Sequence, residues 1–117
     1  MLLALADDKQ LLAVKRMSKR MINTNHTGTL LPQLEYEVRC LDKCKSSPFV
    51  VRYEKSFKDP KYYYIVTEFV AGGSLEALAS RTLKSKSGGL SSKQLQFVAS
   101  QLVLALCDIH SKGVIYR

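Results

Sequence analysis

The two side chains whose types and spacing best suit chemistry are Lys15 and Glu37. Lys15 shares one face of a predicted strand with Leu11 and Ala13, both of which we expect to point inward. Glu37 lies one residue away from the apolar stripe that Leu34, Val38 and Leu41 form on a predicted helix, so it points close to the buried face. A carboxylate in that place needs a partner, because an unpaired buried charge is costly. A lysine held by a glutamate in a half-buried cleft is well suited to gripping phosphate oxygens.

Periodicity alone leaves a second interpretation of these residues open. Lys15 and Glu37 are also compatible with ordinary surface charges, because most lysines and glutamates are exposed to solvent. The choice depends on whether a strand and a helix bring the two side chains together.

The first part of the chain alternates between strand and helix patterns. Residue alternation and β-branched content predict strands, and apolar residues recurring at three and four positions predict a helix. The strand over 62–70 begins with a continuous aromatic and β-branched run, so we place it inside the sheet. The predicted order is a strand over 1–6, a turn over 7–9, a strand over 10–17, a loop over 18–28, a helix over 31–44, and strands over 49–57 and 62–70.

Helices dominate the chain after the glycine pair Gly72 and Gly73. We predict a short helix over 74–83, a basic loop over 84–89, a long helix over 90–111 and the start of a strand over 114–116. Ser91 and Gln94 have the spacing of a capping box at the start of the long helix. The fold class is therefore α+β, a small antiparallel sheet covered by one helix and followed by the first helices of a second lobe.

The composition is that of an ordinary globular domain, with 46% hydrophobic and 24% charged residues. The formal net charge of +8 favours acidic partners such as phosphates, anionic membranes or nucleic acid. The longest apolar stretch, 97–109, is well short of the roughly 20 residues that a transmembrane span needs. Three sparse cysteines do not indicate a disulfide framework, and Cys40 and Cys44 favour ordinary thiols over a metal site. With no secretory signal, a cytoplasmic protein is expected, a nuclear setting being the alternative.

Four motifs in order resemble the eukaryotic protein kinase domain. The segment Ala13-Val14-Lys15 is similar to the Val-Ala-Ile-Lys strand motif, and Glu37 stands where these enzymes carry the glutamate of helix C. Residues 64–75 resemble the fifth strand and the hinge, and residues 109–117 resemble the approach to the His-Arg-Asp catalytic loop. Tyr116 replaces the usual histidine, which is typical of the AGC group of Ser/Thr kinases.

The resemblance implies roles for particular residues in binding ATP. Lys15 would contact the α- and β-phosphates, and Glu37 would hold Lys15. Ala13 would pack on the adenine ring. Thr67 would stand at the back of the adenine pocket, and the backbone of Glu68 and Val70 would hydrogen-bond the adenine edge. Leu41 and Tyr53 would belong to the apolar spine that couples helix C to the catalytic lobe.

The resemblance also implies a partial domain over 1–117. Residues 1–70 would form a small lobe without its first strand and Gly-rich loop, 71–73 the hinge, and 74–117 the start of the large lobe. Arg117 immediately precedes the expected catalytic aspartate, so no catalytic residue and no metal ligand is expected in this chain. Complete, the domain would use ATP and Mg²⁺ to phosphorylate Ser or Thr of a protein substrate; we expect the isolated chain to be inactive.

Two other functions fit parts of the sequence. A truncated, non-catalytic kinase-like module would act by binding regulatory or other protein partners. A basic nucleic-acid-binding domain has little support, because Tyr62, Tyr63 and Tyr64 lie in a strand that we predict to be buried. We therefore expect ATP and a protein substrate as partners, and no nucleic acid.

Overall fold

The computed structural model describes residues 2–5, 10–24, 30–84 and 88–116. They fall into two compact units, Met1–Phe69 and Val70–Arg117. The predictions made for 7–9 and for Arg117 lie outside the described residues. The predicted hinge over 71–73 follows directly on the division between the units, and its action as a hinge stays a prediction.

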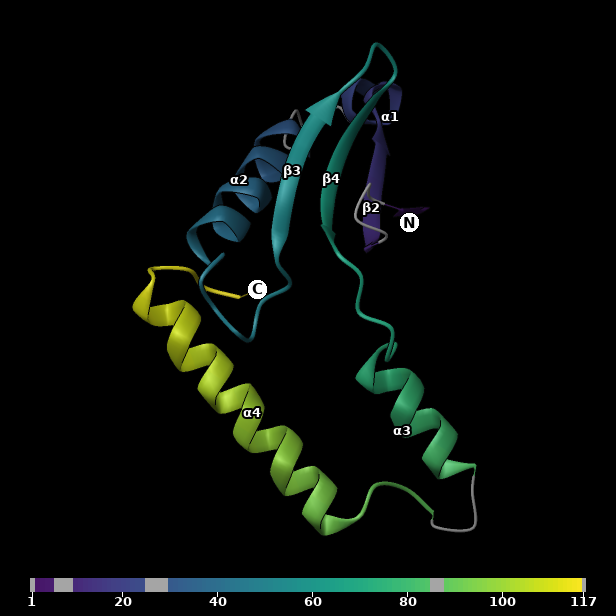
Figure 1. Ribbon diagram of the computed structural model, residues 1–117, viewed down its shortest axis with the longest axis vertical. Helices are drawn as coiled ribbons and strands as arrows, with labels where there is room; N and C mark the ends of the chain where they lie inside the picture. The colour runs from purple at the N-terminus through teal and green to yellow at the C-terminus, as the bar shows by residue number, and fades with distance from the viewer. Residues whose placement is uncertain (1, 6–9, 25–29, 85–87, 117) are drawn as a thin grey trace. The chain divides into compact units, whose positions relative to one another are not determined.

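The first unit is built on a four-stranded antiparallel sheet with the strand order β1-β2-β4-β3. Figure 1 shows β2, β4 and β3 side by side. The predicted interior position of the aromatic strand is confirmed, since β4 pairs with a strand on each side. The strands are β1 (Leu2–Leu5), β2 (Leu11–Ser18), β3 (Tyr53–Lys58) and β4 (Tyr62–Glu68).

The core of this unit lies where β2 and β4 pair. Ala13 faces Thr67 and Val14 faces Val66 across the two strands. Ala13, Val14 and Val66 are buried, as is Ile65 beside them on β4. Paired residues of antiparallel strands point to the same face and successive residues to opposite faces, so apolar side chains are buried on both sides of this pair of strands.

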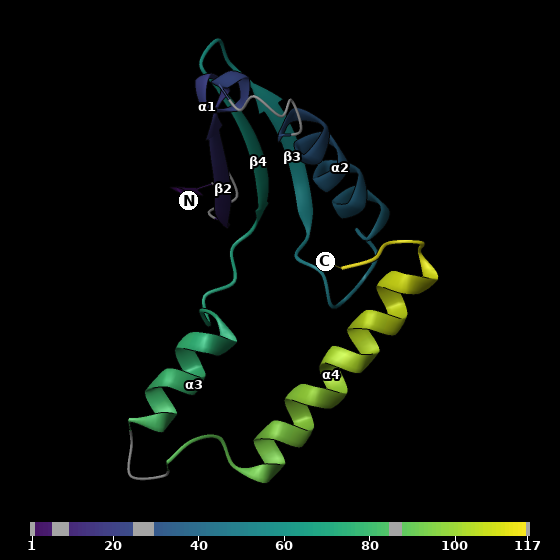
Figure 2. The same ribbon diagram turned by 180° about the vertical axis from the view of Figure 1, so that it is seen from behind.

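One helix, α2 (Leu30–Lys43), lies along β3 in both Figure 1 and Figure 2. Leu34 is its buried apolar residue, which agrees with the stripe that predicted the helix. The helix begins one residue before the predicted range and ends one residue before its predicted last residue.

Two predictions for this unit are wrong. The loop predicted over 18–28 contains a helix, α1 (Lys19–Thr24), whose first amide donates to the carbonyl of Lys61. The strand predicted from 49 begins only at Tyr53. Pro48 has no amide hydrogen, and the amide of Phe49 donates to Ser47 Oγ, so local turn contacts replace strand pairing there.

The turn between β3 and β4 is organised by Asp59. Its carboxylate accepts hydrogen bonds from the amides of Lys61 and Tyr62, at 2.6 and 2.7 Å, and from the Tyr64 hydroxyl at 2.6 Å. The Tyr64 hydrogen bond is the main reason that the pKa of Asp59 lies below its ordinary value, and burial opposes it. The same bond raises the pKa of Tyr64.

The second unit consists of α3 (Leu75–Leu83) and α4 (Ser92–Ser111). Ser74 caps α3 by accepting from the amide of Ala77. The predicted capping box is confirmed, because Ser91 Oγ accepts from the amide of Gln94 and the Gln94 side chain accepts from the amide of Ser91. Together these contacts satisfy amides that have no partner inside a helix.

The end of α4 is a Schellman motif. Gly113, with φ +69°, donates to the carbonyl of His110, and Val114 donates to the carbonyl of Ile109. Ile109 and Val114, the apolar pair that this motif brings together, are both buried. The strand predicted over 114–116 is therefore wrong: these described residues are not in a strand, and the first of them closes the helix.

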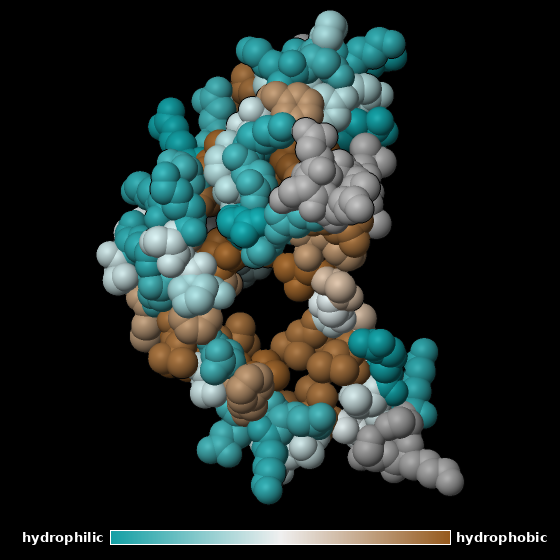
Figure 3. Space-filling view, viewed as in Figure 1, coloured by the Kyte–Doolittle hydropathy of each residue, from teal (hydrophilic) through white to brown (hydrophobic). Residues whose placement is uncertain are grey.

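Apolar side chains are exposed along α4, as the brown surface of the second unit in Figure 3 illustrates. The large exposed apolar residues of α4 are Leu95, Phe97, Leu102, Val103, Leu104 and Leu106. No helix among the described residues is long and apolar enough to cross a membrane.

Candidate functional site

The strand β2 and the helix α2 bring Lys15 and Glu37 together in the first unit. Lys15 Nζ lies 2.7 Å from one carboxylate oxygen of Glu37 and 2.8 Å from the other. The predicted pairing is therefore confirmed. The side chains remain 46% and 41% exposed, so they are surface charges as well as partners.

The solvent exposure of the Lys15–Glu37 pair determines whether it contributes to stability or to positioning. Ion pairs open to solvent contribute about 1 kcal/mol or less to stability, because water screens them and two long side chains must be ordered. The Lys15–Glu37 pair therefore contributes little to the stability of the fold. Its geometric effect is strong, since contact with both carboxylate oxygens restricts where the ammonium group of Lys15 can lie.

Two other predicted residues lie beside this pair on the sheet. Ala13 pairs with Thr67 across β2 and β4, and Lys15 is two residues further along β2, so all three side chains belong to one face. We call it the inner face, because it is the face from which Lys15 reaches α2.

Glu68, the last residue of β4, is tied to the segment before β3. Its amide donates to the carbonyl of Arg52 at 2.9 Å, and its carboxylate accepts from the amide of Arg52 at 2.8 Å. Its carbonyl accepts from Thr67 Oγ1 at 3.2 Å, and a carbonyl oxygen has a second lone pair for another donor.

The six residues predicted for ATP binding are divided between the two units. Five of them, Ala13, Lys15, Glu37, Thr67 and Glu68, belong to the first unit. Val70 is the first residue of the second unit and is 58% exposed. The roles of all six toward the nucleotide stay predictions.

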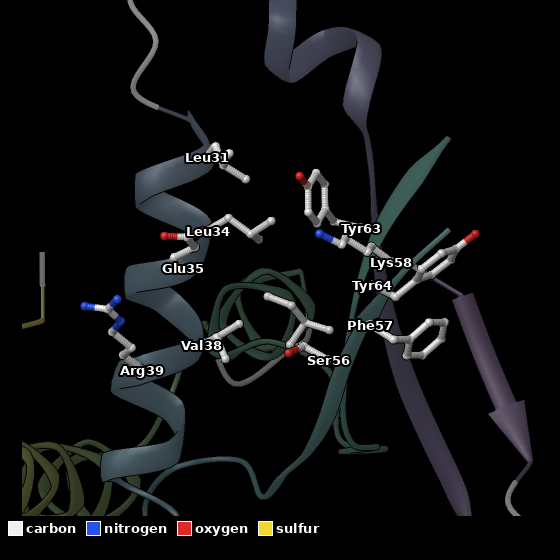
Figure 4. A pocket seen from close by; sticks show the side chains of 11 residues that line it. Leu31, Leu34, Glu35, Val38, Arg39, Ser56, Phe57, Lys58, Tyr63 and Tyr64 are labelled. Atoms are coloured by element: carbon white, nitrogen blue, oxygen red, sulfur yellow. The ribbon is translucent and has the colours of Figure 1, made fainter. Parts of the chain in front are cut away.

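A pocket of about 480 Å³ between α2 and the strands β3 and β4 was not predicted from the sequence. In Figure 4, Leu34 and Val38 point from α2 toward the strands, whereas Phe57 and Tyr64 point away from the helix. The apolar stripe of α2 was visible in the sequence. The residues that line the pocket from β3 and β4 depend on how these two strands pair, which the sequence does not show. Its lining residues are Leu31, Leu34, Glu35, Val38, Arg39, Ser56, Phe57, Lys58, Tyr63, Tyr64 and Ile65, and none of the six predicted ATP-binding residues is among them.

The described residues contain no group of three or more His, Cys, Asp or Glu side chains that could hold a metal ion. Cys40 is partly buried on α2, and Cys44 is buried just beyond its end; neither forms a disulfide with another described cysteine. Free buried cysteines behave as small apolar side chains.

A sheet with this strand order, a helix along its edge and a Lys–Glu pair between strand and helix point to one class of protein. The model of the protein kinase domain matches residues 2–117 of this chain, and the chain belongs to that family. The resemblance drawn from the four sequence motifs is thereby confirmed.

The curated relatives that the chain matches carry the names of protein kinases. It is 35% identical over 107 residues to a cGMP-dependent protein kinase of Plasmodium berghei, covering 90% of the chain and 11% of that relative. It is 31% identical over 112 residues to the serine/threonine-protein kinase SCH9 of Saccharomyces cerevisiae, covering 95% and 13%. It is 32% identical over 117 residues to the protein kinase C-like 2 of Schizosaccharomyces pombe, covering 100% and 11%. The chain thus spans about an eighth or less of the length of these relatives.

Proposed function

We propose that this chain forms part of the nucleotide-binding site of a protein serine/threonine kinase. The observation that carries the proposal is the contact of Lys15 with both carboxylate oxygens of Glu37. An ammonium group has three hydrogens to donate. With Glu37 holding it from one side and nearly half of its side chain exposed, Lys15 keeps donor capacity for phosphate oxygens.

The other residues of the inner face fit the same ligand. By the family resemblance, Ala13 would pack on the purine ring; in the structure it is a buried residue that pairs with Thr67. The Glu68 carbonyl can accept from the exocyclic amine of adenine, and the amide of Val70 would donate to the ring. ATP, when bound, supplies the phosphoryl group that is transferred to the protein substrate, and Mg²⁺ accompanies its phosphates.

The contribution of this chain to transfer is positioning. Lys15, oriented by Glu37, holds the phosphates in place and balances part of their negative charge. Mg²⁺ ligands and the group that accepts the substrate proton would come from other parts of a complete kinase domain. The names of the relatives support a protein substrate phosphorylated on Ser or Thr.

Nucleotide binding to the full-length protein tests the proposal. ATP affinity is measured by calorimetry for the wild type, Lys15→Met and Glu37→Gln. We expect each substitution to weaken binding roughly 10- to 100-fold, the range for losing a charge-assisted hydrogen bond. Lys45→Met is the matched control, because Lys45 also pairs with a carboxylate, Asp42, but at the end of α2. A wild-type protein that binds no ATP would instead support the non-catalytic, protein-binding module.

A further inference from the structure

The face of the sheet opposite α2 carries a row of aromatic side chains in contact with one another. The Phe57 and Tyr64 rings are stacked, with 4.7 Å between their centroids and an angle of 15° between their planes. The centroid of the Tyr62 ring lies 6.2 Å from that of Tyr64 and 4.6 Å from the guanidinium carbon of Arg16. Figure 4 shows Phe57 and Tyr64 pointing away from α2. We call the face that holds Phe57, Tyr62, Tyr64 and Arg16 the outer face.

Strand pairing gives the row a definite order across the sheet. Arg16 on β2 pairs with Tyr64 on β4, and Tyr64 pairs with Phe57 on β3. Because β3 is the last of the described strands in the sheet order, the side of the Phe57 ring that does not touch Tyr64 is turned toward the sheet edge. Phe57 is 49% exposed, so a flat ring from a ligand can stack there and extend the row.

Cations flank the aromatic row. Lys55 is two positions from Phe57 on β3 with no register shift between them, so it also lies on the outer face. Arg16 and Lys55 are exposed, and among the described residues neither forms an ion pair with a carboxylate. The nearby carboxylates of Asp59 and Glu68 already accept hydrogen bonds from backbone amides. The charges that the outer face offers to a ligand are therefore positive, and they favour an anion.

We expected no nucleic acid because three tyrosines lie in a strand that we predicted to be buried. The strand β4 is interior in the sheet, but Tyr62, Tyr63 and Tyr64 are only partly buried. Single-stranded nucleic acid suits a surface of this kind, because its bases stack on aromatic rings while cations hold its phosphates. An acidic peptide would satisfy the same cations, but it does not bring a flat ring with every charge.

We propose that the outer face binds single-stranded nucleic acid. A base stacks on the exposed side of the Phe57 ring, and Lys55 and Arg16 hold phosphates of the same strand. Every base has a flat face, so little preference among sequences is expected. The proposal does not depend on nucleotide binding at Lys15, because successive residues of a strand point to opposite faces of the sheet.

The test measures binding of fluorescein-labelled oligothymidylate and oligouridylate, each of about 12 nucleotides, to the full-length protein by fluorescence anisotropy. These pyrimidine probes avoid the adenine site proposed for the inner face, and together they show whether deoxyribose or ribose strands bind more tightly. We expect Phe57→Leu to weaken binding roughly 5- to 100-fold through lost stacking, and Phe57→Tyr to retain it. Arg16→Gln should weaken binding and reduce the slope of log affinity against log salt by about 0.7, the value for one phosphate contact to a single strand.

Lys15→Gln is the matched control, because Lys15 precedes Arg16 in β2, carries the same charge and points to the inner face. It should leave the oligonucleotide affinity and the salt slope unchanged. An effect as large as that of Arg16→Gln would place the oligonucleotide on the inner face and overturn the proposal.

Two further results would also overturn it. One is a wild-type protein that binds neither probe. The other is binding that Phe57→Leu leaves unchanged, since the face would then attract phosphates by charge alone and suit an acidic peptide equally well. Arg16→Gln changes an exposed side chain, so its result holds even where Phe57→Leu unfolds the protein.

Discussion

Lys15 Nζ contacts both carboxylate oxygens of Glu37, at 2.7 and 2.8 Å, while each side chain keeps more than two fifths of its surface in solvent. This combination separates positioning from stability. A screened pair contributes little to the free energy of unfolding, yet it can define where a cation meets a phosphate.

We therefore expect Glu37→Gln to act on binding far more than on folding. The unfolding free energy of the full-length protein should change by about 1 kcal/mol or less, because the pair is half exposed. ATP affinity should fall roughly 10- to 100-fold. Chemical denaturation and calorimetry on the same samples measure the two effects, and Asp42→Asn, in the other lysine–carboxylate pair, should change neither strongly. A large loss of stability with intact ATP affinity would contradict this prediction.

The Asp59–Tyr64 hydrogen bond makes stability depend on pH at both extremes. Because folding lowers the pKa of Asp59 below its ordinary value of 3.8, its contribution is complete above that value and is lost as the pH falls through the lower, folded-state pKa. Because folding raises the pKa of Tyr64 above 10.0, its contribution is complete below pH 10 and is lost as the pH rises through the raised pKa.

Asp59→Asn should therefore be less stable than the wild type at neutral pH, with the difference shrinking below about pH 4. Tyr64→Phe keeps the ring but not the hydroxyl. Its unfolding free energy should therefore lack the decline that the Tyr64 hydroxyl causes above pH 10. Urea unfolding between pH 2 and pH 11 checks both. An unfolding free energy that differs from the wild type by the same amount at every pH would show that the hydrogen bond is not the cause.

Removal of the Ser91 cap should destabilise α4 at its N-terminus. Ser91→Ala loses the acceptor for the Gln94 amide and should cost about 0.5–2 kcal/mol, whereas Ser91→Gly should cost only a few tenths. Hydrogen exchange of the first amides of α4 reports this locally. Ser92→Ala is the control, one position inside the helix. Equal exchange rates in Ser91→Ala and Ser92→Ala would contradict the capping role.

Truncation of Ile65 should have the largest effect on the sheet. Ile65 is 3% exposed in the central strand β4, so Ile65→Ala should cost about 2–5 kcal/mol through lost burial and the cavity left behind. Leu11→Ala, at a position 48% exposed on β2, should change stability far less. The two variants are compared by thermal unfolding of the full-length protein. Similar losses of stability in both would contradict the assignment of Ile65 to the core.

Much of the local structure was predictable because short patterns determine it. The apolar spacing around Leu34 predicted α2 to within one residue at each end, and Ser91 with Gln94 predicted the start of α4. The failures have different causes. Lys19–Thr24 is joined by a backbone hydrogen bond to the distant Lys61, which no local pattern shows, whereas the first of residues 114–116 closes α4 through the Gly113 motif instead of starting a strand.

The candidate site divides in the same way. The pairing of Lys15 with Glu37 was predicted from two periodicities and a resemblance, because each side chain lies on a definite face of its own element. The position of Tyr53 beside Thr67 was not predicted, because a bulge at Glu54 changes the register of β3 and no local sequence pattern indicates that bulge. The pocket between α2 and β3 likewise depends on how two elements pack.

The sequence by itself determined the family, the order of most elements and the pairing of Lys15 with Glu37, because these follow from residue types, periods and motif spacing along the chain. Only the tertiary structure decided which strands are neighbours, which side chains share the inner face, and that the Tyr53 hydroxyl donates a hydrogen bond to Ser56 Oγ there. The physical reason is that register and packing are properties of contacts between distant segments, whose free energies are settled only when the whole sheet assembles.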